Sequence, residues 1–221
     1  PTFAQDVDEF KKGNFYSLKL MLNTGGSRYK YTNAETDNEQ GRLGYGVGFD
    51  YQKFFSEHTY LTLGGEINSR GYKASSSFGL TRVRATYLDI PVTINFITGD
   101  RPFFSYHDKF LFGFGAYAGI GIMGKYLPPN GSWTTLKFGE SNTDNRSRTD
   151  YGWILNLGYK TEGLPFLIFS LASGLKNVLP ADNHGVYDWR KLSCFKMYLM
   201  VPIESKAKKK GQPKYKTYKK R

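Results

Sequence analysis

Apolar and polar residues alternate with a period of two along most of this chain. The clearest stretch covers residues 43–52, where large apolar residues alternate with glycine or a carboxylate: Leu43, Tyr45, Val47, Phe49 and Tyr51 against Gly44, Gly46, Gly48 and Asp50. Such alternation predicts a strand with one apolar face, and no window has a convincing helical period. Eight segments follow the pattern: 15–23, 43–52, 60–69, 84–96, 110–123, 151–160, 167–176 and 192–203. We therefore expect an all-β protein with eight strands.

The connections between these segments indicate how the strands are arranged. Long or polar connections, at 24–42, 73–82, 127–150 and 177–190, alternate strictly with short ones at 53–59 and 161–165 and one of middling length at 98–109. Bacterial outer-membrane barrels have this asymmetry, with long loops outside the cell and short turns in the periplasm. Each segment is at least nine residues long, which is enough to cross a bilayer when the strand is tilted. The pattern predicts an eight-stranded antiparallel up-and-down transmembrane β-barrel.

The polarity of the two strand faces decides which one is outside. The face opposite the apolar one consists mainly of Gly, Ser, Ala, Thr and Asn, which is too weakly charged for the outside of a soluble barrel but suits a narrow lumen. We expect the apolar face to contact lipid in the bacterial outer membrane, because only a closed barrel satisfies the strand backbones there. Aromatic residues near the strand ends are expected to form interfacial girdles: Tyr51, Phe54, Phe55, Tyr60, Phe96, Phe103, Phe104, Tyr126, Tyr151, Trp153 and Tyr159.

Charged residues of both signs fall on the predicted inner face. They are Lys19, Asp50, Glu66, Asp89, Lys160, Lys176 and Lys196. Buried charges are costly unless they pair, so we expect a network of salt bridges that fills the lumen. The alternative is a proton or ion path, or a catalytic pair of carboxylates. Eight strands enclose only enough space for side chains, which favours the network.

Composition adds three constraints. The length of 221 residues is typical of a single all-β domain. The single cysteine, Cys194, excludes a disulfide framework and a multi-cysteine zinc site. The longest uncharged stretch, residues 110–124, is broken by five glycines and is too short for a membrane-spanning helix.

One segment resembles a known family. Residues Tyr87, Leu88, Asp89, Ile90 and Pro91 resemble the Tyr-Leu-x-Ile-Pro signature of the PorT-like outer-membrane β-barrel family of Bacteroidota. Residues 44–50, 63–67 and 112–119 resemble that family's neighbouring strands in the same order, so the resemblance covers roughly residues 15–203. It implies a monomeric or complex-associated barrel, and some relatives belong to the type IX secretion and gliding machinery. A proline within a strand also costs a ladder hydrogen bond, so we expect a bulge or an unpaired position at Pro91.

The two ends of the chain flank this barrel. Residues 1–14 are expected to form an N-terminal periplasmic strap, although Thr2 and Ala4 also suit the end of a secretory signal. Residues 204–221 are expected to form a basic periplasmic tail, which contributes +8 of the net charge of +12. Its cations are Lys206, Lys208, Lys209, Lys210, Lys214, Lys216, Lys219, Lys220 and Arg221. The tail either contacts anionic lipid, cell-wall polymer or an acidic protein partner, or is a solvated end. Its location argues against nucleic acid.

The sequence contains no recognisable catalytic or metal motif. His58, His107 and His184 are too dispersed for a metal site. His184 could be combined with Asp182, Asp188 and Ser141 or Ser147 into a hydrolytic set, but no Gly-x-Ser-x-Gly motif is present.

We therefore expect no catalytic residues, no metal and no cofactor. The expected function is that of a non-enzymatic anchor or accessory subunit of an envelope complex, in type IX secretion and gliding or in outer-membrane protein assembly. Its contacts with lipid and with protein partners would come from the extracellular loops and the basic tail. The alternatives are a lipid-modifying outer-membrane enzyme and a soluble ligand-binding barrel.

Overall fold

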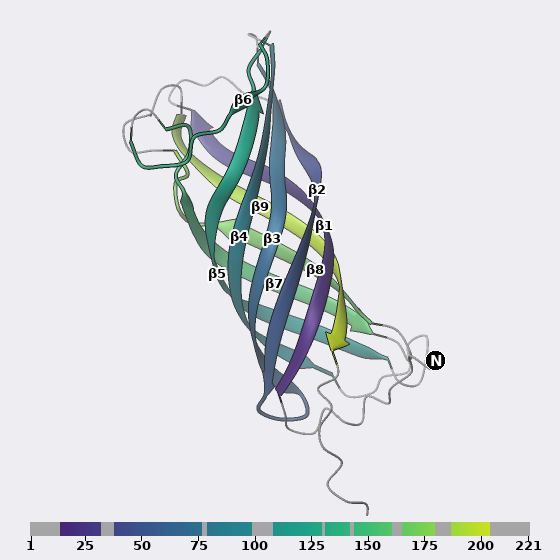
Figure 1. The fold of residues 1–221 in the computed structure, drawn as a ribbon. Helices are drawn as coiled ribbons and strands as arrows, with labels where there is room; N and C mark the ends of the chain where they lie inside the picture. The colour runs from purple at the N-terminus through teal and green to yellow at the C-terminus, as the bar shows by residue number, and fades with distance from the viewer. Residues whose placement is uncertain are drawn as a thin grey trace, which may run out of the picture.

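Eight long antiparallel strands close into a barrel (Figure 1). The computed structural model describes residues 14–31, 38–76, 79–98, 108–129, 131–141, 144–160, 165–179 and 187–203. The strands are β1 (Asn14–Tyr31), β2 (Asn38–Phe54), β3 (Thr59–Ser76), β4 (Gly79–Ile97), β5 (Lys109–Leu127), β6 (Thr134–Thr135), β7 (Thr149–Lys160), β8 (Phe166–Gly174) and β9 (Tyr187–Ile203). Each long strand pairs with the next one, and β9 pairs with β1.

The two-residue strand β6 lies outside this ring. It pairs with residues 125–126 of β5. The predicted all-β, up-and-down antiparallel barrel is confirmed, and the strand count differs from eight only through β6. In the part of the chain that the structure describes, no helix is long and apolar enough to cross a membrane.

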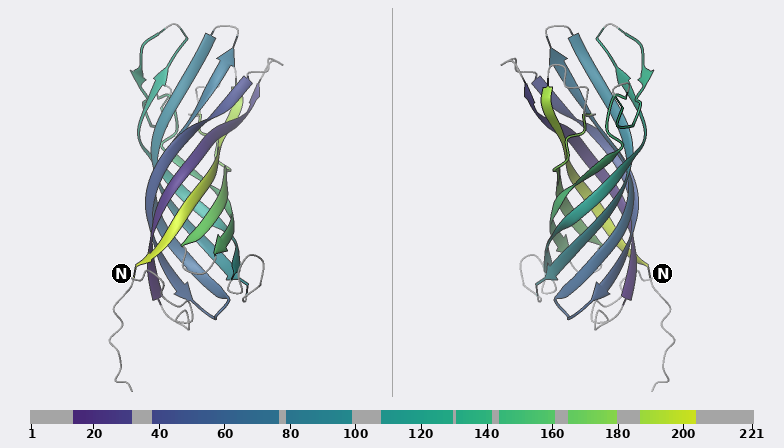
Figure 2. Two further views of the ribbon diagram at one scale, coloured as in Figure 1. Left: turned by 90° about the vertical axis from the view of Figure 1, so that its right-hand side faces the viewer. Right: turned by 90° about the vertical axis from the view of Figure 1, so that its left-hand side faces the viewer.

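The strands are longer than predicted at one end of the barrel. β1 begins and β9 ends at the opposite end, which also carries the short connection 55–58 (Figures 1 and 2). At the other end, strand structure occupies much of the expected loops 24–42 and 73–82, and β3 and β4 are joined by residues 77–78 alone. The strict alternation of long and short connections was therefore wrong. These extensions lack an apolar face, because a strand that projects into water needs none.

As predicted, the apolar face of the strands points out of the barrel and the polar face points into the lumen. Leu18, Leu20 and Leu22 are 48–59% exposed, whereas Lys19 and Met21 between them are each 3% exposed. Since the large apolar side chains point out of a closed ring and charged ones point into it, the outer wall suits lipid rather than water.

Two of the expected girdle aromatics lie inside instead. Phe54 and Tyr60 are buried and stack with ring centroids 4.7 Å apart. Phe54 lies two residues after the buried Gln52, and Tyr60 lies two residues before the buried Thr62, so both rings fall on the lumen-facing side of their strands. The girdle was predicted from closeness to the strand ends, without regard to this alternation. Phe55, Phe96 and Tyr151 are exposed as expected, and four others are partly exposed: Tyr51, Tyr126, Trp153 and Tyr159. Phe103 and Phe104 lie outside the described residues.

Apolar clusters close the lumen on both sides of a polar layer. The cluster near the short-turn end contains Met21, Phe54, Tyr60, Leu111, Phe166, Ile168, Tyr198 and Met200. The cluster near the loop end contains Tyr72, Val83, Ala85, Tyr87, Leu136, Val178 and Leu192. Leu136 and Phe138 of the β5–β7 connection pack where Gly124 and Gly121 leave room, since a Cβ on either glycine would collide with them. This connection therefore covers the mouth of the barrel.

Pro91 interrupts the β3–β4 ladder, as expected. The pairs Leu63–Val92 and Glu66–Asp89 flank a gap opposite Gly64 and Pro91, with no change of register. A Cβ added to Gly64 would lie 2.9 Å from Cγ of Pro91 and would also meet the carboxylate of Asp50. Glycine at this position lets the proline ring fit inside the wall.

Candidate functional site

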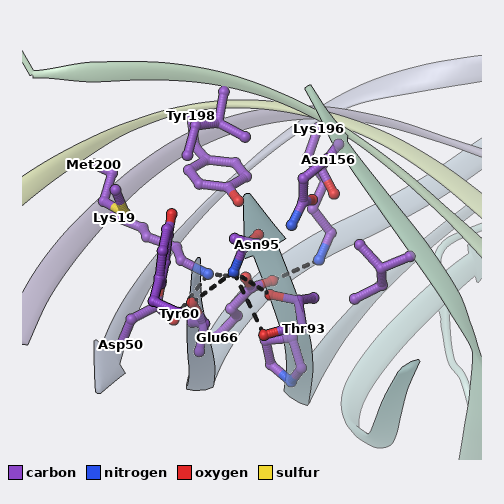
Figure 3. A pocket seen from close by; sticks show the side chains of 15 residues that line it. Lys19, Asp50, Tyr60, Glu66, Thr93, Asn95, Asn156, Lys196, Tyr198 and Met200 are labelled. Atoms are coloured by element: carbon purple, nitrogen blue, oxygen red, sulfur yellow. Dashed lines mark hydrogen bonds and ion pairs between the residues drawn. The ribbon is translucent and has the colours of Figure 1, made fainter. Parts of the chain in front are cut away.

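A buried carboxylate, Glu66 of β3, lies between two lysines at the centre of the lumen. Nζ of Lys19 on β1 lies 2.8 Å from one oxygen of Glu66 and 2.9 Å from Asp50 of β2. Nζ of Lys196 on β9 lies 2.5 Å from the other oxygen of Glu66. The four side chains converge in Figure 3, and each is at most 4% exposed. The charges of four strands are thus compensated within one layer.

The network continues from Lys196 towards the loop end. Nζ of Lys196 lies 3.6 Å from Asp89 of β4, which also pairs with the guanidinium of Arg70 on β3. Arg70 reaches on to Asp150 of β7 at 3.2 Å. Together with Asp50, Lys19 and Glu66, these residues form one continuous chain of alternating charges, which we call the lumen network.

Neutral groups hold the upper part of the lumen network in place. Asn68 donates a 2.6 Å hydrogen bond to Asp89 and accepts one of 3.0 Å from Nε of Arg70. The hydroxyl of Tyr117 on β5 donates to Asp150 at 2.8 Å. The Arg70 guanidinium lies 5.0 Å from the ring centroid of Tyr87 and 5.3 Å from that of Tyr117. These contacts fix the orientation of a planar cation that would otherwise rotate freely.

Two further arginines close the mouth above the lumen network. Arg146 of the β5–β7 connection is buried, and its Nη1 donates to the hydroxyl of Tyr87 at 3.5 Å. Arg190 of β9 donates to the hydroxyl of Tyr72, and its guanidinium lies 4.8 Å from that ring centroid. The polar layer therefore ends in a lid of cations and aromatic rings.

The structure brings five of the seven predicted inner charges together: Lys19, Asp50, Glu66, Asp89 and Lys196. Lys160 is the last residue of β7 at the short-turn end, where its Nζ lies 5.5 Å from the ring centroid of Phe166. Lys176 lies beyond the end of β8 at Gly174 and pairs with Glu140 at 3.0 Å. Placing Lys176 in the lumen was wrong, because the strand ends two residues earlier than the alternation suggested.

Arg70 and Asp150 of the lumen network were not among the predicted inner charges. Arg70 follows directly after the predicted segment 60–69, and Asp150 precedes the segment 151–160. Both occupy lumen-facing positions of their strands: Arg70 comes two residues after Asn68, and Asp150 comes two residues before Gly152, and all four are buried. Extending the alternation by one residue would have found them.

Within the family-like signature, alternate residues face the lumen. Tyr87, Asp89 and Pro91 are buried inside, while Leu88 and Ile90 face outward with more exposure. The signature therefore supplies one charge of the lumen network and the aromatic ring that stacks on its arginine.

The other candidates do not assemble into a reactive site within the described residues. His58 lies in an exposed turn, and Ser141 donates to Asp144. Ser147 is buried and donates a 2.5 Å hydrogen bond to Glu140, which also accepts from Lys176. These two hydrogen bonds lower the pKa of Glu140 from its ordinary value. Among the described side chains, no group of three or more His, Cys, Asp or Glu is placed to hold a metal ion.

Several predicted residues lie outside the described residues: His107, Asp182, His184, the side chain of Asp188, and all nine cations of the tail from Lys206 to Arg221.

Little free space remains in the lumen. Beside the lumen network, where Asn95 donates to Thr62 and Thr93 at 2.9 and 3.0 Å (Figure 3), the cavity measures about 20 Å³. That is room for about one water molecule. A closed barrel with an apolar outer wall and a charge-filled lumen defines the class: the protein is a transmembrane β-barrel of the outer membrane.

Known proteins resemble this chain only in three dimensions and at low sequence identity. No family model and no curated protein matches the chain. Among solved structures, it is similar to OprG, an outer membrane protein of Pseudomonas aeruginosa, with 9% identity over 90% of this chain and 100% of that one, at a TM-score of 0.46.

Ail, the attachment invasion locus protein of Yersinia pestis, solved with the heparin analogue sucrose octasulfate, has 10% identity over 86% of this chain and 99% of that one, at a TM-score of 0.44. The translocator domain of the autotransporter NalP from Neisseria meningitidis has 7% identity over 85% and 88%, at 0.36. All three TM-scores lie below 0.5, so what those proteins bind or do does not transfer to this chain.

Proposed function

We propose that this chain is a non-enzymatic outer-membrane barrel that serves as an anchor or accessory subunit of an envelope complex. The observation that carries the proposal is the filled lumen. Because paired charges occupy the interior of the barrel, interactions with other molecules would use its outer surface, its loops and its termini.

The filled lumen argues against transport. The charges of the lumen network compensate one another through successive contacts, none longer than 3.6 Å. In order, the residues are Asp50, Lys19, Glu66, Lys196, Asp89, Arg70 and Asp150. The cavity beside them holds about one water, and apolar clusters lie on either side. A solute would have to break several buried ion pairs to pass, at a cost of several kcal/mol each.

The same contacts argue against catalysis in the lumen. A general base needs a free lone pair aimed at a substrate, whereas each carboxylate of the lumen network is engaged by a lysine or an arginine. Ser147 is paired with a carboxylate rather than with an imidazole. A carboxylate is a weaker base than an imidazole, and hydrogen bonds from Ser147 and Lys176 lower the pKa of Glu140 further, so it is poorly suited to activate the hydroxyl.

The choice of complex rests on the resemblance to the PorT-like family, whose signature supplies Tyr87, Asp89 and Pro91 to the inside of this barrel. We assign the chain to the type IX secretion and gliding machinery or to outer-membrane protein assembly on that resemblance. The basic segment 204–221 and the β5–β7 connection are the assigned contact regions.

Affinity purification from native membranes tests this proposal. The full chain, tagged at its N-terminus and so outside both assigned contact regions, is solubilised in mild detergent and its partners are identified. We expect a stoichiometric envelope protein that is lost when residues 205–221 are deleted, with unchanged barrel folding as the control. Recovery of the barrel alone, with an unchanged phenotype on deletion of its gene and of the tail, would contradict the proposal.

A further inference from the structure

Four cationic side chains line one hollow on the outer wall of the barrel. They are Arg42 of β2, Lys73 of β3, and Arg82 and Arg84 of β4, and the hollow measures about 300 Å³. We call this feature the cationic hollow. Its volume is at the lower end of the range of small-molecule sites.

The alternation of β4 places the cationic hollow outside the lumen. Val83 and Ala85 are 4% and 1% exposed within the barrel, so Arg82 and Arg84 point outward. Lys73 pairs with Arg82 in the ladder, and Gly71 pairs with Arg84. Gly41 of β2, which carries no side chain, also lines the hollow. Arg42 reaches the hollow from a stretch of β2 where the register with β3 shifts.

The cationic hollow lies at the upper border of the lipid-facing surface. Leu43 lines its edge and is 69% exposed, and Tyr45, two residues further towards the membrane, is 77% exposed. A ligand seated here would contact cations on one side and bare apolar side chains on the other.

Among the described residues, no acid compensates the charges of the cationic hollow. Its lining contains no acid, and among the described residues no ion pair reaches any of the four cations. Nε of Arg82 is buried without a hydrogen-bond partner. Like charges at close range repel one another. An anion with several oxygens would relieve this repulsion and satisfy the free donors.

One of the cations is held in position by a loop. The guanidinium of Arg84 lies 4.8 Å from the ring centroid of Trp133, in the β5–β7 connection. Such stacking leaves the N–H groups at the edge of the guanidinium free to donate. Arg84 is therefore oriented before a ligand arrives, which reduces the entropic cost of binding.

We propose that the cationic hollow binds the phosphate groups of the glycolipid in the outer leaflet of the outer membrane. Such a lipid carries its phosphates directly above its acyl chains, which matches cations placed directly above Leu43 and Tyr45. Arginine pairs suit phosphate because their fork matches its oxygens. This inference rests on the membrane location of the barrel and is independent of any protein partner.

Binding of purified full-length protein to defined lipids tests the inference. The barrel in zwitterionic detergent is titrated with bisphosphorylated lipid A, with dephosphorylated lipid A, and with inorganic phosphate, and bound lipid is counted by native mass spectrometry. The double variant Arg82→Gln with Arg84→Gln removes two charges from the cationic hollow. The matched control Lys53→Gln with Lys137→Gln removes two exposed charges elsewhere.

We expect the Arg82 and Arg84 double variant to bind bisphosphorylated lipid A about tenfold more weakly, the size expected for lost charge-assisted hydrogen bonds. The control should bind as the parent does, and Arg82→Lys with Arg84→Lys should retain most of the affinity. Heat-dependent gel migration shows that each variant is folded. Equal binding of dephosphorylated lipid A, equal loss in the control, or displacement of the lipid by an equimolar amount of inorganic phosphate would overturn the inference.

Discussion

Glu66 is the residue on which the lumen charges depend most directly. It is the shared partner of Lys19 and Lys196, at 2.8 and 2.5 Å. Removing one member of a buried ion pair leaves an uncompensated charge, which costs more than the pair itself contributes. The two lysines are not equivalent after such a loss, because Lys19 keeps Asp50 and Lys196 keeps only the more distant Asp89.

We predict that Glu66→Leu lowers the free energy of unfolding by about 3–5 kcal/mol. The additional change Lys196→Met should recover part of this loss, because it removes the poorly compensated ammonium and leaves Lys19 with Asp50 and Arg70 with Asp89 and Asp150. The measurement is the temperature at which the folded gel band disappears. Lys53→Gln, at an exposed position outside the lumen, is the control. A double variant no more stable than Glu66→Leu would contradict this account.

At the scale of the elements, β3 and β4 illustrate how a wall strand accommodates an irregular residue. Pro91 breaks the ladder, and the neighbouring glycines at 64 and 65 face opposite sides of the wall. A Cβ at Gly64 would meet Asp50 and Pro91, whereas a Cβ at Gly65 would have no atom within 4 Å. The two positions share a strand and differ only in what they face.

We therefore predict that Gly64→Ala destabilises the barrel by about 1–3 kcal/mol, as overpacking does. Gly65→Ala should be neutral or slightly stabilising, since alanine loses less backbone entropy than glycine on folding. Urea titration of refolded protein in lipid vesicles measures both. Equal effects of the two substitutions would show that the close approach of Gly64 to Pro91 does not constrain the wall.

A second element, the β5–β7 connection, is fastened over the mouth by Glu140. Its carboxylate accepts hydrogen bonds from Ser147 at 2.5 Å and from Lys176 at 3.0 Å, which hold its pKa below the ordinary 4.5. A carboxyl with a lowered folded pKa contributes stability that is complete above its unfolded value and is lost as the pH falls through the folded value.

We predict that the connection becomes more susceptible to pepsin as the pH falls below the ordinary glutamate pKa and through the lower folded pKa of Glu140, where this carboxylate takes up a proton. In Glu140→Gln the susceptibility should already be raised at higher pH and should change less with pH. Cleavage rates followed by mass spectrometry test this. An unchanged pH profile in the variant would assign the effect to other acids.

At the scale of the whole molecule, side chains occupy the part of the lumen that the described residues line. Eight ring strands, two apolar clusters and the lumen network leave about 20 Å³ free beside the network. Barrels of about eight strands enclose little more than their own side chains, whereas porins of 16–18 strands leave an aqueous channel.

We predict no steady ion conductance when the folded protein is inserted into a planar bilayer. Unheated protein should nonetheless migrate differently from boiled protein in a detergent gel, which verifies that a folded barrel was tested. A porin inserted under the same conditions provides the positive control. Reproducible open-channel currents would contradict the filled lumen.

The period-two alternation predicts the barrel, the polarity of its wall and much of its lumen, because a lipid-facing wall requires an apolar residue at every second position. The strand extensions at the loop end could not be predicted in this way, since both of their faces are polar or small. Arg70 and Asp150 were lost at these boundaries, and Lys176 was wrongly included at another. The stacking of Trp133 on Arg84 and the packing of Leu136 into the mouth depend on how a loop folds back, which alternation does not encode.

Closure of the ring between β1 and β9 has a consequence for the order in which the barrel folds. Neighbouring strands form hairpins, but this seam joins the two ends of the barrel sequence, so its loop-closure entropy is the largest. Cysteines placed at the paired positions Leu20 and Leu199 should therefore crosslink later in refolding than cysteines at Leu20 and Val47.

Lys19 and Lys196 lie on opposite sides of this seam and meet on the same carboxylate of β3. Until β9 arrives, Glu66 has one of its two cations and the membrane-facing edges of β1 and β9 are unpaired. The ion pair between Lys196 and Glu66 can therefore form only once β9 has joined the ring, and it then stabilises the closed barrel.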